Sequence, residues 1–232
     1  PAKLYAKGVR AGDVKYFDYN EDGDISDADR MNVGKAIPDF YGGITSNFSY
    51  KGFDLSLFGQ FSVGGKVMSA WRGVNGSEGT DHLGLALSNV KVSDRGESVE
   101  QYFNVSKEVA NGYWRGEGTS NTIPRPVRIG VHTGYDYDYN VQTSTRYLED
   151  ASYFKLKTVT LGYTLPESVV KKLRVNSLRV YISADNLLTL TKYSGYDPET
   201  SFSGSPGDSN YGVDFGLQPV LRTFIFGLNL NF

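Results

Sequence analysis

Apolar and polar residues alternate along five segments of the chain, and this period of two predicts five β-strands. The first two run over 43–50 and 53–61. Lys51-Gly52 between them forms a tight turn, with glycine where a positive φ is needed. The other three segments run over 153–165, 178–190 and 222–232. The pattern therefore predicts an all-β protein built from antiparallel strands.

The segment over 153–165 changes phase near its middle. Val159 and Leu161 share one parity, whereas Phe154 and Leu156 have the opposite parity. Two interpretations remain open at this point. Either a β-bulge resets the register, or the first half of the strand projects beyond an apolar environment.

The last segment has the clearest division into two faces. Its apolar face consists of Phe224, Phe226, Leu228, Leu230 and Phe232. Thr223, Gly227, Asn229 and Asn231 form the opposite face, where Ile225 is the only apolar residue. Its length suits the roughly 9–11 residues with which a tilted strand crosses a bilayer. A face carrying two asparagines suits a wet lumen better than a packed core.

Short and long connections alternate between the predicted strands. The turn at 51–52 and the link over 166–177 are short, whereas the stretches 62–146 and 191–221 are very long. Outer-membrane barrels have short periplasmic turns and long extracellular loops. The alternation therefore favours a transmembrane barrel whose last strand runs inward. A soluble sandwich with two large insertions is the alternative, although structureless loops of this length are uncommon in soluble domains.

Composition narrows the possible functions. The formal net charge of −2 argues against nucleic-acid binding, which needs a basic surface. The chain has no cysteine, which excludes disulfides and thiolate chemistry. No run approaches the roughly 18 apolar residues of a spanning helix, and 17 Tyr, 13 Phe and 27 Gly suit a β-barrel. The chain starts at Pro1 without a signal peptide, so we expect the front of a longer protein to be missing.

An acidic segment at 18–29 follows the twelve-residue calcium loop of EF-hands, with oxygen-bearing residues at alternating positions and glycine at the sixth. Ca²⁺ takes six to eight oxygen ligands, which such a loop can direct to one point. The alternative is a solvated acidic turn. The expected ligands are Asp18, Asn20, Asp22, Asp24 through its backbone carbonyl, Ser26 and Asp29. We expect a structural clip for an extracellular loop, because no long helix follows.

Other residues with possible chemistry lie in the long stretch over 62–146. Aromatic and basic side chains there could stack on or clamp a substrate, or pack against a neighbouring protein. These candidates are Trp71, Trp114, Arg115, Tyr135 and Tyr137. His82 and His132 lack metal-ligand spacing and are expected to be solvated loop residues. No catalytic motif is visible, so we do not expect an enzyme.

The whole chain resembles the C-terminal part of SusC/RagA-type TonB-dependent transporters of Bacteroidetes. Five blocks carry the resemblance in order: GDVKYFDYNEDGDISDADR, YGGITSNFSYKGFDLSLFGQF, RYLEDASYFKLKTVTLGYTLP, SLRVYISADNLLTLTKYSGYDPE and RTFIFGLNLNF. Gly227, Leu230 and Phe232 in the last block also resemble the signal read by the barrel-assembly machinery. Ile225 departs from that signal, which usually has a polar residue there.

The resemblance implies the C-terminal strands of a plugged barrel of about 22 strands. Residues 1–39 would form an extracellular loop, and 40–232 the barrel strands with long extracellular loops over 62–146 and 191–221. It also implies import of glycan or peptide oligomers through the outer membrane. A SusD-like lipoprotein would assist at the surface, and the TonB complex would act through an absent N-terminal part. The alternative is a soluble, calcium-stabilised β-domain that binds surface glycans.

Overall fold

The computed structural model describes residues 2–70, 86–92, 98–101, 111–125, 127–129, 139–141, 143–199 and 211–232. The chain divides into two compact units, which are described separately. One comprises Pro1–Gly34 with Met68–Leu148, and the other comprises Lys35–Val67 with Glu149–Phe232. Within the described residues, no helix is long and apolar enough to span a bilayer.

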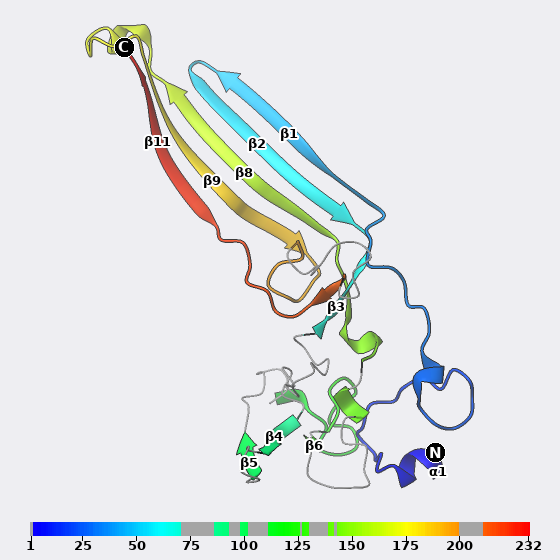
Figure 1. The fold of residues 1–232 in the computed structure, drawn as a ribbon. Coiled ribbons are helices and arrows are strands. Elements are labelled where there is room, and N and C mark those ends of the chain that lie inside the picture. Colours follow the sequence, from blue (N-terminus) through cyan, green and yellow to red (C-terminus); the bar gives the residue numbers. More distant parts are fainter. Residues whose placement is uncertain are drawn as a thin grey trace. The chain divides into compact units, whose positions relative to one another are not determined.

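The second unit contains one antiparallel sheet of five strands in the order β1-β2-β8-β9-β11 (Figure 1). Its strands are β1 (Phe40–Tyr50), β2 (Phe53–Val63), β8 (Tyr153–Thr164), β9 (Ser177–Thr191) and β11 (Thr223–Asn231). These are the five strands that the sequence predicts. The turn Lys51-Gly52 joins β1 to β2, with both residues at positive φ. β1 and β11 form the two edges of the sheet.

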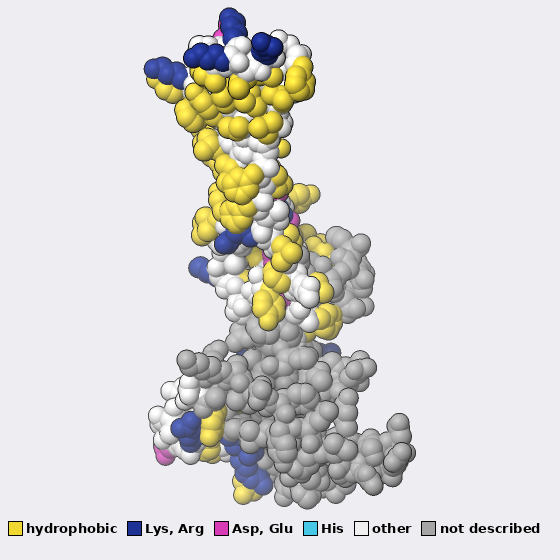
Figure 2. Space-filling view, turned by 90° about the vertical axis from the view of Figure 1, so that its left-hand side faces the viewer, with side chains coloured by type: hydrophobic (Ala, Val, Ile, Leu, Met, Phe, Trp, Pro, Cys, Tyr) yellow, Lys and Arg dark blue, Asp and Glu magenta, His cyan; other side chains and the backbone are white. Residues whose placement is uncertain are grey.

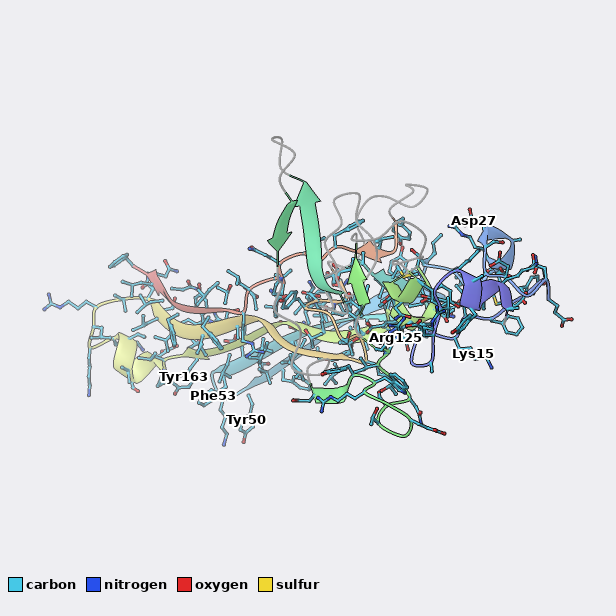
Figure 3. The ribbon with its side chains drawn as sticks, turned by 90° about the horizontal axis from the view of Figure 1, so that it is seen from below. Lys15, Asp27, Tyr50, Phe53, Arg125 and Tyr163 are labelled. Atoms are coloured by element: carbon cyan, nitrogen blue, oxygen red, sulfur yellow. The ribbon has the colours of Figure 1, made fainter. Side chains whose placement is uncertain are left out.

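One face of this sheet is apolar and open. Phe226 of β11 lies opposite Ile182 of β9 and is 78% exposed, and Leu228 beside it is 60% exposed. Apolar side chains cover much of the sheet surface in Figure 2. Aromatic rings gather near the turns, where Phe53 and Tyr163 lie 4.4 Å apart between ring centres (Figure 3). A soluble β-domain would bury this face, so its exposure favours a lipid-facing wall.

A bulge in β8 explains the change of phase in the sequence. Thr158 pairs with Phe58 of β2, whereas the next partner, Gly59, pairs with Leu156, so Lys157 is left over. The bulge returns Leu156 to the apolar face shared by Val159. The first of the two sequence interpretations is therefore confirmed.

The polar face carries an ion pair that spans three strands. Arg179 of β9 donates to Asp54 of β2 from Nε at 2.9 Å and from Nη2 at 2.5 Å. The pair passes over Gly162 of β8, which lies between these strands. A Cβ at Gly162 would overlap both the guanidinium and the carboxylate. Similarly, the Tyr181 ring lies over Gly227 of β11.

Ion pairs with β8 hold the first residues of the connection after β9. Lys155, only 1% exposed, donates to Asp197 at 2.5 Å and to Glu199 at 2.8 Å. Lys157 donates to both oxygens of Glu199 at 2.8 and 2.6 Å. Nearby, Tyr193 packs with Val67 and Ala151 in a small buried cluster and donates to Asp214.

The remaining elements are short. A second sheet has the order β10-β3-β7, with strands Val213–Asp214, Lys66–Ser69 and Leu148–Asp150. A third has the order β5-β4-β6, with strands Ser98–Gln101, Ala86–Val92 and Val127–Ile129. Among the described residues are the helices α1 (Ala2–Ala6) and α3 (Glu167–Val170), with 3₁₀ turns at Asp27–Asp29, Tyr139–Val141 and Thr145–Tyr147. The stretch over 62–146 thus contains strands that the sequence does not predict.

Candidate functional site

Side chains of the acidic loop at 18–29 accept hydrogen bonds from backbone amides of the same loop. Asp18 accepts from the amides of Asp22 at 3.2 Å and Gly23 at 2.8 Å. Asn20 accepts from the Asp22 amide at 3.1 Å, and Asp22 accepts from the Asp24 amide at 2.7 Å. Gly23 takes the positive φ of +79° that this turn needs. Three predicted ligands, Asp18, Asn20 and Asp22, therefore all accept from the backbone amides of residues 22–24.

Asp29 closes the loop through a capping box. Its carboxylate accepts from the amide of Ser26 at 2.7 Å and from that of Tyr19 at 2.9 Å. The Ser26 amide bond is the main cause that lowers the pKa of Asp29. Asp24 instead accepts two bonds from Lys7, at 2.7 and 2.9 Å, and this contact lowers the pKa of Asp24.

These contacts define what the loop offers a cation. The described residues hold no cluster of three or more His, Cys, Asp or Glu side chains arranged around one metal position. Because the side chain of Asp24 is engaged by Lys7, only its backbone carbonyl is left for an ion, as the motif requires. The donor types fit calcium, but Asp18, Asn20 and Asp22 would have to exchange amide contacts for the ion.

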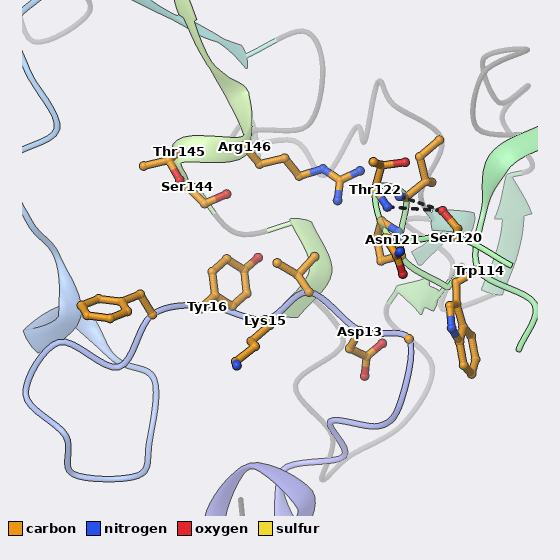
Figure 4. A pocket seen from close by; sticks show the side chains of 15 residues that line it. Asp13, Lys15, Tyr16, Trp114, Ser120, Asn121, Thr122, Ser144, Thr145 and Arg146 are labelled. Carbon is orange, nitrogen blue, oxygen red and sulfur yellow. Dashed lines mark hydrogen bonds between the residues drawn. The ribbon is translucent and has the colours of Figure 1, made fainter. Parts of the chain in front are cut away.

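A cleft of about 640 Å³ lies in the first unit, within the size range of ligand sites. Three segments line it: Gly12–Phe17, Trp114 with Ser120–Pro124, and Ser144–Arg146 (Figure 4). Figure 4 shows the Arg146 guanidinium extending toward Thr122, while Lys15 points away from it. The cleft is lined mainly by hydroxyl and amide side chains together with aromatic rings.

A buried polar network holds these segments together. Asp13, with a side chain 4% exposed, accepts from Arg125 Nη2 at 2.9 Å and from Asn140 Nδ2 at 2.8 Å. Asn140 in turn accepts from the Val14 amide at 2.8 Å. Tyr16 donates to the Tyr139 carbonyl at 2.6 Å. The cleft wall is thus fixed before any ligand arrives.

The structure places only some of the predicted substrate residues. Trp114 lines the cleft, with one indole face against Gly12. Arg115 lies outside the lining and stacks on Tyr113, 4.5 Å from the ring centre. Trp71, Tyr135 and Tyr137 lie outside the described residues, as do His82 and His132. Ser144 and Arg146 line the cleft but were not predicted, because no local motif marks them.

The predicted assembly-signal residues lie on β11 or directly after it. Gly227 faces the polar side beneath Tyr181, whereas Leu230 pairs with Leu178 on the apolar side. Phe232 ends the chain and is largely exposed. Recognition by an assembly machinery stays a prediction.

Known proteins resemble this chain over nearly its whole length, although no family model matches it. TonB-dependent receptor P3 of Formosa agariphila is 33% identical over 225 residues, which are 95% of this chain and 19% of that protein. TonB-dependent receptor P26 of the same organism is 32% identical, over 99% of this chain and 21% of that protein. TonB-dependent receptor SusC of Bacteroides thetaiotaomicron is 26% identical, over 99% of this chain and 19% of that protein.

Solved structures show the same fold. A chain of the RagAB peptide importer has a TM-score of 0.55 in its open-open state and 0.58 in its closed-closed state. Both are 22% identical and cover 90% of this chain and 19% of the solved chain. The present chain spans about a fifth of the length of the curated relatives it matches.

Proposed function

Because the chain belongs to the SusC- and RagA-type TonB-dependent receptors, we propose that it forms part of an outer-membrane importer of large nutrient oligomers. The observation that carries the proposal is the five-stranded sheet with one open apolar face and one polar face. Lipid would cover the first face, and the second would line the lumen around a plug. The protein would bind and gate its cargo without making or breaking a covalent bond.

The partners follow from the same family membership. We propose a SusD-like surface lipoprotein at the outer loops, the TonB complex as energy source and the barrel-assembly machinery for insertion. RagAB is named as a peptide importer, so a peptide oligomer stands beside a glycan oligomer as cargo. In addition, we propose that the loop at 18–29 binds Ca²⁺ and stiffens an outer loop.

Deleting the gene of the full-length receptor tests this function. The proposal expects loss of growth on one class of oligomer as sole nutrient, and unchanged growth on its monomer. Disabling the TonB complex should reproduce the loss, because active import needs that energy source. If labelled oligomers enter equally fast with and without the receptor, the proposal is wrong.

A further inference from the structure

The cleft at Gly12–Phe17, Trp114, Ser120–Pro124 and Ser144–Arg146 contains a positive charge without a counter-charge. In the part of the chain that the structure describes, no carboxylate pairs with the Arg146 guanidinium. A guanidinium stays charged at any physiological pH and offers a planar fork of donors. Since Arg146 is half-buried and extends into the cleft, it is placed to receive an anion (Figure 4).

The one carboxylate in the lining cannot neutralise that charge. Asp13 is engaged by Arg125 and Asn140 on the side of the buried network. Lys15, also in the lining, is exposed and points away from Arg146 (Figure 4), so the unpaired charge in the cleft is that of Arg146. The cleft therefore carries excess positive charge, which favours an anionic ligand.

A second observation points to a missing partner. The hydroxyl oxygen of Ser144 is buried in the cleft wall and has no hydrogen-bond partner among the described residues. A buried polar atom without a partner costs free energy, and a bound ligand can supply the missing hydrogen bond. Ser144 and Arg146 lie two positions apart in the chain, and both line the cleft.

The remaining backbone and side-chain groups that line the cleft favour a saccharide over a peptide as its ligand. Peptides commonly bind by adding to free backbone groups. Here the amides of Val14, Trp114 and Ile123 already donate within the chain. The side chains of Asn121 and Thr122 remain exposed, and Trp114 offers an aromatic surface. Side-chain hydroxyls and amides beside an aromatic ring suit sugar hydroxyl groups.

We propose that this cleft binds an acidic sugar unit of an oligosaccharide, with Arg146 on its carboxylate or sulfate group and Ser144 on a neighbouring oxygen. The proposal rests on the importer function and names its substrate class. Arg146 is then the residue that selects acidic over neutral oligomers. A bidentate guanidinium contact supplies both the affinity and the geometry of this selection.

Titration calorimetry on the full-length receptor tests the proposal with four probes: a uronate oligosaccharide, a sulfated oligosaccharide, a neutral malto-oligosaccharide and an acidic peptide. We expect one acidic oligosaccharide to bind, and the choice between the first two probes identifies its anion. Arg146→Gln should weaken that binding at least about tenfold, and Arg146→Lys should restore part of it. Ser144→Ala should weaken it several-fold. Lys172→Gln, an exposed position on the link between β8 and β9 in the other unit, is the control.

Each other outcome overturns the proposal: no acidic saccharide binds, the neutral probe or the peptide binds better, or Arg146→Gln binds normally while its melting temperature is unchanged. Uptake assays separate this failure from failure of the importer function. If the receptor still imports an oligomer but Arg146→Gln does not change which oligomer enters, only the cleft assignment is wrong. If no oligomer depends on the receptor, the importer function itself is wrong.

Discussion

At Gly162, the absence of a side chain decides whether the polar face of the sheet can hold its ion pair. Arg179 and Asp54 come from strands that are not neighbours, and the pair must cross β8 between them. Any Cβ at Gly162 would occupy that crossing. Glycine therefore serves here through its small volume rather than through an unusual backbone angle.

Replacing Gly162 by alanine should separate Arg179 from Asp54 or displace β8, at a cost of about 1–3 kcal/mol. Urea unfolding of the full-length receptor in lipid measures the change. The same replacement in a receptor that already carries Asp54→Ala and Arg179→Ala should cost much less, because the crossing is then empty. An equal cost in both backgrounds would show that the ion pair is not the reason for the glycine.

Calcium binding to the loop at 18–29 should raise the melting temperature of the full-length receptor. A ligand that binds only the folded state stabilises it by about 2.7 kcal/mol at 100 times its dissociation constant. Asp22→Ala should remove the calcium response, whereas Asp27→Ala should keep it, since Asp27 is not at a ligand position and pairs with Arg30. A melting temperature that is the same in calcium and in chelator would refute the metal site.

At the scale of elements, β8 carries two lysines near its first residues, and one of them, Lys157, is the bulge residue. Lys155 and Lys157 both reach Glu199, so the connection after β9 begins from a fixed point. Such buried charges are tolerated because each finds opposite charges and hydrogen bonds. The network orders the start of a long loop whose length alone would suggest flexibility.

Acid should break the ion pairs that Lys155 and Lys157 make with Glu199. Burial by itself raises the pKa of Glu199, but the contacts with Lys155 and Lys157 outweigh it and leave the pKa below its usual 4.5. Stabilisation from a lowered carboxyl pKa is complete above the unfolded value and is lost as pH falls through the folded value. The protection of residues 192–199 from hydrogen exchange, taken relative to the intrinsic exchange rate at each pH, should therefore fall below pH 4.5. Glu199→Gln should make exchange fast already at neutral pH, whereas Glu167→Gln, at the exposed pair with Lys171, should not.

The sequence predicted the elements better than it predicted the cleft. Period-two alternation found all five strands of the main sheet, because each has one apolar and one polar face. The sequence alone could not decide whether β8 contains a bulge, because the bulge is defined by the pairing of β8 with β2. The cleft joins Gly12–Phe17 to Ser144–Arg146 through Asp13 and Asn140, and no local pattern announces contacts between such distant segments. Trp114 was found by residue type alone.

At the scale of the whole molecule, the main sheet has two open edges among the strands that the structure describes. β1 and β11 each have one neighbour in the sheet, so each leaves an edge of backbone groups to be paired. Within a bilayer such edges must be paired, and closure with further strands is the way that barrels achieve it. In the importer proposed above, lipid would cover the open apolar face and further strands would pair with the two edges.

A charge placed on either face of β11 should distinguish the lipid side from the lumen side. Phe226→Arg, near the middle of the strand on the apolar face, should cost about 2–4 kcal/mol in the full-length receptor, because it puts a charge into hydrocarbon. Asn229→Arg, on the polar face of the same strand, should cost much less. Heat-dependent mobility on gels reports the folded barrel in outer membranes. Equal loss of folded receptor in both variants would mean that lipid does not cover this face, and the transmembrane assignment of the sheet would be wrong.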